Sequence, residues 1–269
     1  MKRVLMLRFL FVLLLAMLMG CSETSTEPED EEPVTVASEE AKLIAMCLSD
    51  SLGPPAALSL RVENDLVKIR DCYGSTYQVV DAVRFTTPWE PSAIMIKFDE
   101  ATAQLVLQGD YHAWDGLNEE LGIAEIEEEL LSSIGIATVH FEGIINPRRV
   151  VGVYASLPGV ERVDPNYRVG DWSCIYPRLV EDQITYLFRE GWGDCPAGCT
   201  YDRYWYFVFV EGQPTLIGVW CPHEAPWVPG WWGEAWQNRE LYWSWQVPLR
   251  HARPRSSAGG TSAKPGGSG

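Results

Sequence analysis

The alternation of apolar and polar residues predicts a chain built from both helices and strands. Near its start, Ser38 is a suitable N-cap for a helix that the sequence Gly53-Pro-Pro would stop. Leu43, Ile44 and Cys47 form the apolar stripe of this helix. The first folded segment is therefore expected to begin with a helix that buries one face.

After this helix, the apolar period changes to that of a strand. Leu58, Leu60 and Val62 alternate with polar residues, which predicts a β-hairpin over residues 58–71. A helix and a hairpin of this size bury little apolar surface by themselves. Residues 38–91 are therefore predicted to form a small helix-hairpin unit that needs a covalent crosslink.

Residues 92–171 show a succession of strand and helix patterns. Apolar residues alternate over 94–98 and again over 137–141, which predicts two strands that each bury one face. Between them, Ala124–Ile134 has apolar residues at four-residue spacing and is predicted to be a helix, preceded by an insertion over residues 100–123. With a second helix and strand after them, these elements predict an α+β fold in which helices cover one face of a small, mostly antiparallel sheet.

The second helix and the last strand of this unit have clear start and stop signals. Asn146 can cap the helix, and Val150, Tyr154 and Leu157 lie on one face of it. The strand that follows is expected to end at Pro165, because proline has no N–H group to donate to a neighbouring strand.

This helix, turn and strand resemble the end of the propeptides of subtilisin-like proteases, particularly the fervidolysin-like N-terminal prodomain. Those propeptides end in a helix, a Leu-Pro-Gly-Val turn and a Val-(Asp/Glu)-Pro-Asn strand. The matching residues are Leu157, Pro158, Gly159, Val160, Val163, Asp164, Pro165 and Asn166. The resemblance covers less than a third of the 269 residues, and no protease sequence follows it within them. It implies a ferredoxin-like, open-faced sandwich of the inhibitor type.

The resemblance also implies a mode of protein binding. In that family the sheet packs on the protease, and the segment after the last strand lies extended in the active-site cleft. Carried over to this chain, the segment is 165–171, with Pro165, Asn166, Tyr167 and Arg168 as the protein-binding residues. A subtilisin-like protease or another surface protein is the implied partner, bound by β-augmentation and side-chain pockets.

Residues 172–249 are predicted to form a third unit, rich in cysteine and tryptophan. Pro177 opens a predicted helix that ends at Gly191, and a hairpin joins Tyr204–Val210 to Thr215–Cys221. The first strand of this hairpin is apolar on both faces, so it is expected to lie between two layers. The unit is therefore predicted to be a second helix-hairpin structure, stabilised by disulfides.

Tryptophans are concentrated at the end of this unit: Trp227, Trp231, Trp232, Trp236, Trp243 and Trp245. Indole rings can stack on sugars or anchor a protein partner. Trp231, Trp232 and Trp236 are therefore candidates for a glycan-binding platform, which gives cell-wall or glycan binding as the alternative function. Two other interpretations stay open: these rings pack on the neighbouring aromatic hairpin, or they contact the membrane interface, where tryptophan is common.

Six cysteines follow Cys21: Cys47, Cys72, Cys174, Cys195, Cys199 and Cys221. An even number in an exported chain favours disulfides. The grouping along the chain favours the pairs Cys47–Cys72, Cys195–Cys199 and Cys174–Cys221. A zinc site made by the last four cysteines is the alternative.

The first residues predict export and lipid anchoring. Three basic residues and the apolar run Phe9–Met19, which is too short to span a bilayer, indicate a signal peptide over residues 1–20. The junction Leu18-Met-Gly-Cys21 resembles a bacterial lipobox, which implies lipidation of Cys21. Ser22 resembles the pattern of lipoproteins sent to the outer membrane. The resemblance therefore places the protein in the cell envelope, held at the membrane through Cys21.

Beyond the signal peptide, the two ends of the chain are predicted to be disordered, and its negative charge argues against nucleic acid as a partner. Residues 21–37 read as an acidic, disordered spacer and residues 250–269 as a disordered tail. The formal net charge is −16, so binding to nucleic acid is not expected.

The sequence shows no constellation that indicates catalysis, a cofactor or a metal site. His112 lies near Asp110 and Asp115, but Asp115 also suits the start of a helix. His140 and Glu142 share the exposed face of a predicted strand and read as a solvated pair. The prediction is therefore a non-enzymatic protein-binding lipoprotein without a cofactor.

Overall fold

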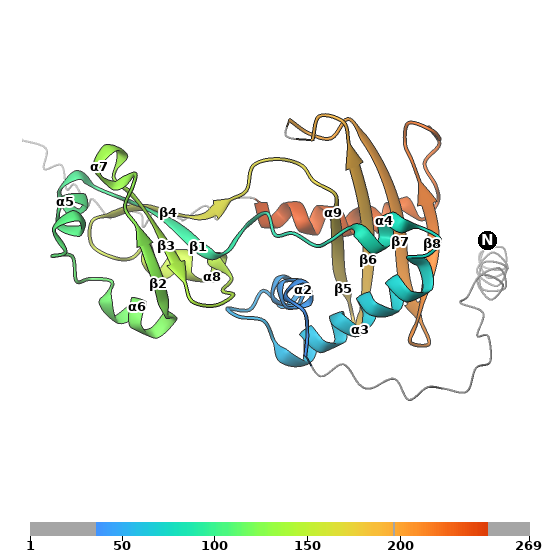
Figure 1. Ribbon diagram of the computed structural model, residues 1–269, viewed down its shortest axis with the longest axis horizontal. Helices are drawn as coiled ribbons and strands as arrows, with labels where there is room; N and C mark the ends of the chain where they lie inside the picture. The colour runs from blue at the N-terminus through green and yellow to red at the C-terminus, as the bar shows by residue number, and fades with distance from the viewer. Residues whose placement is uncertain (1–35, 196, 247–269) are drawn as a thin grey trace, which may run out of the picture.

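The structure is a computed structural model, which describes residues 36–195 and 197–246 (Figure 1). The predicted signal peptide, Cys21, most of the acidic spacer and the tail lie outside these residues. No helix among the described residues has the length and hydropathy needed to cross a bilayer.

The structure confirms the predicted α+β class. It contains two four-stranded antiparallel sheets, with the strand orders β2-β3-β1-β4 and β5-β6-β7-β8. Each sheet belongs to one of two lobes (Figure 1). The first lobe contains β1–β4 and the second contains β5–β8, and each lobe has its own cluster of buried apolar residues.

The lobe around β1–β4 has the ferredoxin-like order of elements. Its elements are β1 (Trp89–Phe98), α5 (Glu100–Gln108), α6 (Asp115–Leu121), β2 (Ile123–Glu127), α7 (Leu131–Ile134), β3 (Ile136–Phe141), α8 (Pro147–Tyr154) and β4 (Val160–Tyr167). Apart from the short α7, this is the β-α-β-β-α-β succession of the split β-α-β fold. We call it the ferredoxin-like lobe.

The structure corrects two elements of this lobe. The predicted helix over Ala124–Ile134 is instead β2 followed by the single turn α7, and the predicted insertion over residues 100–123 supplies the crossover helices α5 and α6. Ile126 of β2 lies opposite Val139 of β3. The four-residue apolar spacing suggested a helix, but pairing with β3 provides the backbone hydrogen bonds of residues 123–127. Such tertiary pairing can outweigh the local apolar pattern.

The following helix begins where predicted, but it ends at Tyr154 instead of continuing to Leu157, and the strand after it is longer than expected. The side chain of Asn146 accepts a hydrogen bond from Arg148 N at 3.2 Å, and Val150 and Tyr154 are buried. β4 continues through Pro165, which lies opposite Ile94, as far as Tyr167. Proline is tolerated there because β4 is an edge strand and has a partner on one side only.

The second lobe has three layers. Its elements are α2 (Glu39–Ser49), α3 (Ala56–Tyr73), α4 (Gln78–Ala82), β5 (Cys174–Val180), β6 (Gln183–Trp192), β7 (Tyr201–Val210), β8 (Gln213–Trp220) and α9 (Trp232–Gln246). The helices α2 and α3 cover one face of the sheet, and α9 covers the other. As predicted, residues of β7 are buried on both faces, from Tyr204 to Phe207.

The predicted hairpin over residues 58–71 is wrong, because these residues belong to the helix α3. Val62, Leu66, Ile69 and Tyr73 repeat with helical spacing and are buried against the sheet. The alternation from Leu58 to Val62 covers only about one turn of α3. It is therefore too short to distinguish the two-residue period of a strand from the 3.6-residue period of a helix.

The predicted helix between Pro177 and Gly191 is also wrong, because β5 and β6 form a hairpin there. The two-residue turn Glu181-Asp182 joins them, with Glu181 at φ 54°. Six consecutive residues of β6, from Ile184 to Arg189, are buried because both faces of the sheet are covered. Burial on both faces removes the alternation that identifies a strand.

The units predicted at 38–91 and 172–249 are not separate domains, because they share one apolar core. Tyr73 of α3 packs on Phe207 of β7 with ring centroids 5.2 Å apart, and its hydroxyl donates to Pro214 O. Phe85, which precedes β1, packs edge-on against Trp245 of α9. The ferredoxin-like lobe is therefore inserted between the two sequence segments that build the second lobe.

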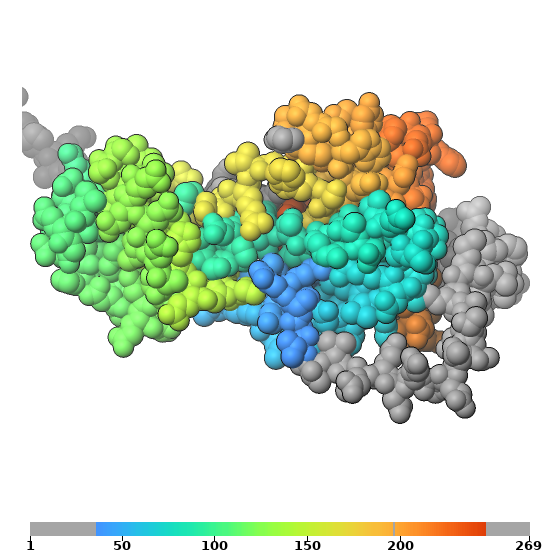
Figure 2. Space-filling model, viewed as in Figure 1, coloured from blue at the N-terminus to red at the C-terminus, as the bar shows by residue number. Residues whose placement is uncertain are grey.

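The two lobes also meet at the α2–α3 connection. Arg149 of α8 forms an ion pair with Asp50 at 2.6 Å, and Asn146 N donates to Leu52 O. Figure 2 shows this blue connection against the ferredoxin-like lobe, which is green and lies on the left. A second junction is formed by residues 86–88 and 168–172, which run between the lobes before β1 and after β4.

Candidate functional site

One face of the ferredoxin-like sheet is left uncovered. Ile94, Ile96 and Val139 face α5 and α8 and are fully buried. Most of the alternate residues of the same sheet face the other way and are half-buried or exposed, although Ala93 on this side is fully buried. The half-buried or exposed ones include Met95, Lys97, Glu125, Glu127, Thr138, His140, Arg162 and Asp164. These eight residues define what we call the open face. Among the described residues, no core cluster forms on this side of the sheet.

Polar contacts run across the strands of the open face. His140 Nε2 lies 3.5 Å from Glu127 Oε2, and His140 Nδ1 lies 3.9 Å from Glu90 Oε1. Asn166 Nδ2 donates to Glu90 Oε2 at 2.8 Å. The predicted partner of His140 was Glu142, but His140 contacts residues of the neighbouring strands instead. Side chains that lie opposite each other on adjacent strands approach more closely than side chains two residues apart on the same strand.

The segment predicted to enter a protease cleft is fixed at both ends. Pro165 is buried, Asn166 and Tyr167 are half-buried in β4, and Arg168 N donates to Pro88 O at 3.0 Å. At its far end, Asp171 N donates to Cys195 O. Between these points, Val169 is 87% exposed. The segment therefore presents a short exposed loop rather than a free extended tail.

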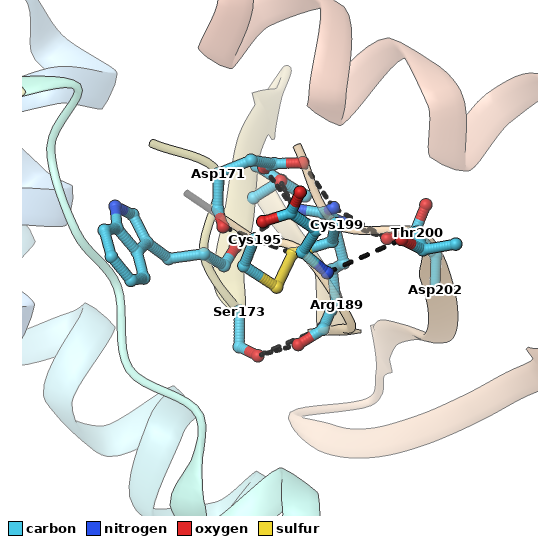
Figure 3. Close-up of a disulfide and its surroundings, with 11 residues drawn as sticks. Asp171, Ser173, Arg189, Cys195, Cys199, Thr200 and Asp202 are labelled. Carbon is cyan, nitrogen blue, oxygen red and sulfur yellow. Dashed lines mark hydrogen bonds and ion pairs between the residues drawn. A yellow bond between two sulfur atoms is a disulfide. The ribbon is translucent and has the colours of Figure 1, made fainter. Parts of the chain in front are cut away.

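Asp171 is held by a buried arginine in the second lobe. The Arg189 side chain is 1% exposed, and Figure 3 shows it between Asp171 and Asp202. Its guanidinium donates to both oxygens of Asp171, to Asp202 Oδ1 at 2.7 Å and to Trp172 O at 3.0 Å. Burial alone would lower the pKa of Arg189, but the hydrogen bonds and the two carboxylates outweigh it and raise the pKa.

A small pocket lies at the junction between the lobes. It has a volume of about 190 Å³ and is lined by Thr86, Thr87, Pro88, Arg168, Gly170, Trp172 and Tyr242. Tyr242 Oη donates to Thr86 O at 2.8 Å, so the tyrosine hydroxyl is already satisfied. The pocket is smaller than the roughly 300–1,000 Å³ typical of drug-sized ligands.

The three tryptophans predicted to bind glycan pack largely against the sheet and against one another. Trp231 stacks on Tyr206 with an interplanar angle of 17°, and Trp232 packs edge-on against Trp220 at 4.4 Å. The Trp231 and Trp232 rings are inclined by 71°, so they do not form a flat platform. Trp236 is half-buried like the other two and packs on Trp243, which is 38% exposed.

The cysteines agree with one predicted pair only. Cys195 and Cys199 form a disulfide, visible in Figure 3. Cys47, Cys174 and Cys221 carry free thiols, so the predicted pairs Cys47–Cys72 and Cys174–Cys221 are wrong. α3 and the sheet provide the packing that the small predicted unit lacked, so no crosslink between Cys47 and Cys72 is needed. The four-cysteine zinc site is excluded, because two of its members are bonded to each other.

The sequence reasoning missed a cluster of three potential metal ligands. Cys221, His223 and Glu224 follow β8, and one donor atom from each lies within 4.8 Å of the others. The spacing Cys-x-His-Glu is visible in the sequence, but the even number of cysteines favours a disulfide for Cys221 instead. By contrast, His112 and Asp115 form a solvent-exposed pair at the start of α6, with His112 73% exposed.

No family model, curated protein or solved structure matches this chain.

Proposed function

We propose that this chain is a non-enzymatic, lipid-anchored protein of the bacterial cell envelope that binds another protein through the open face of its ferredoxin-like lobe. The lipid on Cys21 and an outer-membrane location are parts of this proposal that rest on the lipobox resemblance. A subtilisin-like protease, or another surface protein, is the proposed partner.

The observation that carries this proposal is the one-sided covering of the sheet. A four-stranded sheet with helices on one face only leaves the side chains of the other face available for a partner. The open face combines both signs of charge with Met95 and Thr138, which lie opposite each other at its centre. Mixed polar and apolar surfaces of this kind are typical of non-obligate protein interfaces.

The fixed segment changes the proposed binding mode. Because residues 165–171 are held at Pro88 and Cys195, the open face would supply the main contact and the exposed loop around Val169 a secondary one. The outer edge of β4 adds a place where an extended strand of the partner could pair.

The purified protein is expected to inhibit at least one member of a panel of subtilisin-like proteases with a one-to-one stoichiometry. The variant Thr138→Arg should weaken this inhibition at least about tenfold, because burying an unpaired charge in an interface costs more than about 1.4 kcal/mol. Residual protease activity, measured at several ratios of protein to enzyme, checks this result.

The matched control is Gln237→Arg, which adds the same side chain at an exposed position of α9. Equal weakening by both variants would contradict a role of the open face. The variant Arg168→Ala then reports whether the loop takes part, since its backbone contact to Pro88 is retained. Full activity of every protease with the intact protein would contradict inhibition.

Glycan binding is a second candidate, favoured by the contact between the half-buried Trp236 and the exposed Trp243. Their ring centroids are 5.1 Å apart, and the Arg239 guanidinium carbon lies 5.2 Å and 4.6 Å from the Trp236 and Trp243 ring centroids. An aromatic ring beside an arginine can stack on a sugar and donate hydrogen bonds to its hydroxyls.

Under this second candidate, Trp236→Ala is expected to abolish pull-down on insoluble cell-wall glycan, because it removes the stacking surface. Trp227→Ala serves as the control, because Trp227 is 68% exposed and lies outside this aromatic group. Unchanged pull-down with Trp236→Ala would contradict glycan binding at this surface.

A further inference from the structure

We propose that Cys221, His223 and Glu224 form a binding site for a divalent transition-metal ion, with Zn²⁺ as the best chemical match. Nothing in the proposed protein-binding function requires this site, and it lies in the other lobe. The inference therefore stands or fails independently of that function.

The spacing of the donor atoms carries the proposal. Cys221 Sγ lies 3.3 Å from His223 Nδ1 and 3.7 Å from His223 Nε2. With Zn–S near 2.3 Å and Zn–N near 2.1 Å, a tetrahedral ion separates sulfur from nitrogen by about 3.6 Å. The Glu224 carboxylate lies within 4.8 Å of both donors, so a small rotation of two exposed side chains would complete three ligands.

The donor types select the metal class. A thiolate and an imidazole suit Zn²⁺ and other borderline or soft ions, whereas Mg²⁺ and Ca²⁺ prefer oxygen ligands alone. Three protein ligands leave one position of a tetrahedral ion for water or for an external ligand.

The backbone around the cluster holds these residues together. Glu224 N and Ala225 N both donate to Cys221 O, at 3.1 Å and 2.9 Å, which closes a turn directly after β8. Trp220 Nε1 donates to Ala225 O at 2.9 Å and fixes the exit of this turn. The turn therefore brings all three donors to one side before any ion binds.

The thiol of Cys221 is available for this role. It is buried, with 6% exposure, and it is not part of a disulfide. Its Sγ donates to Asp202 O at 3.4 Å, and deprotonation of the thiol for metal binding would replace this hydrogen bond. The imidazole of His223 packs against the rings of Tyr201 and Trp192, with centroids 4.8 Å and 5.3 Å apart. These rings hold the imidazole in place beside the thiol.

Arg203 is the group that competes with a metal ion. Its Nη2 donates to Glu224 Oε1 at 2.8 Å, so Glu224 must leave this ion pair to coordinate a metal ion. The side chain of Arg203 is 35% exposed and can move into solvent. The Arg203 guanidinium and the metal ion would thus compete for the Glu224 carboxylate.

Titration of the purified protein with Co²⁺, without a polyhistidine tag and under argon, tests the site. The wild-type protein is expected to develop the near-ultraviolet thiolate-to-cobalt charge-transfer absorption, together with the visible bands of a tetrahedral ion. Competition with Zn²⁺ then gives the zinc affinity. Cys221→Ser should lose the charge-transfer band, and His223→Ala should bind Zn²⁺ at least about tenfold more weakly, as even outer-shell losses reach this size.

Two further variants complete the design. Arg203→Met is expected to bind Zn²⁺ more tightly than the wild type, because it frees the Glu224 carboxylate. His112→Ala removes an exposed histidine far from the cluster in sequence and should leave the affinity unchanged. His223 is exposed, so His223→Ala remains informative even if replacement of the buried Cys221 disturbs folding. Absence of the thiolate band in the wild type, or its persistence in Cys221→Ser, would overturn the proposal.

Discussion

Replacing Arg189 with methionine is expected to lower the free energy of unfolding of the second lobe by about 3 kcal/mol. Arg189 is buried at 1% exposure, and its guanidinium satisfies Asp171, Asp202 and the carbonyl of Trp172. Methionine fills much of the same volume but leaves both carboxylates without their cation. Removal of one partner from a buried ion pair costs roughly 3–5 kcal/mol. The low end applies because Asp171 and Asp202 are 36% and 23% exposed.

The loss should be local to the junction and the sheet of the second lobe. Hydrogen exchange of the amides of β5, β6 and β7 gives the free energy of opening for this lobe separately. Asp171 anchors the segment that follows β4, so its own amide, which donates to Cys195 O, should lose protection first.

Arg203→Met is the matched control for Arg189→Met. Both substitutions remove an arginine that pairs with a carboxylate, but Arg203 is 35% exposed and its partner Glu224 is 58% exposed. Exposed ion pairs contribute only about 0–1 kcal/mol, so this variant should unfold nearly as the wild type does. Similar losses of unfolding free energy in the two variants would show that burial does not determine how much the Arg189 ion pairs contribute to stability.

Replacing Gly159 with alanine is expected to destabilise the ferredoxin-like lobe by about 3 kcal/mol, from two separate costs. Gly159 has φ +74°, in the left-handed region, where a side chain costs about 1–2 kcal/mol. A Cβ at this position would also lie 2.6 Å from the Cβ of Thr102 on α5. The turn between α8 and β4 therefore approaches the crossover helix too closely for any side chain.

A double-mutant cycle separates the steric cost from the backbone cost. In Gly159→Ala/Thr102→Gly the clashing atoms are gone, so an interaction energy of about 1–2 kcal/mol should be recovered relative to the two single variants. Gly109→Ala is the control, because Gly109 has φ +76° with no atom within 4 Å of the added Cβ. It should cost only about 1–2 kcal/mol. Equal losses for Gly159→Ala and Gly109→Ala would contradict the steric part.

Elements with local start and stop signals were predicted well from the sequence. Ser38 caps α2 by accepting a hydrogen bond from Ala41 N, and Asn146 caps α8, as their side chains indicated. The alternation at 94–98 and 137–141 identified two strands that bury one face, because water on the other face keeps the alternate residues polar. The same residues gave the α+β class.

The candidate surfaces were only partly predictable. The pattern placed Pro165, Asn166, Tyr167 and Arg168 at the end of a strand, but not the contacts to Pro88 and Cys195 that fix the segment. The open face could not be predicted without knowing which strands pair with each other. The contacts of His140, for example, are with Glu90 and Glu127, which are distant from it in the sequence. The cluster of Cys221, His223 and Glu224 was local in sequence, but it was concealed by the assumption that every cysteine was paired.

By itself, the sequence determined the class of the fold, the N-terminal caps of α2 and α8, the hairpin of β7 and β8 and the Cys195–Cys199 disulfide, because each depends on residues close together in the chain. Only the tertiary structure decided whether residues 58–71, 124–134 and 177–191 form helix or strand. Their apolar spacing is short enough to fit the period of either element. These segments adopted the structure that their distant partners required: α3 lies on a sheet formed more than 100 residues later, β2 pairs with β3, and β6 is covered on both faces. Burial against such partners contributes more free energy than local propensity, so long-range packing made the final choice.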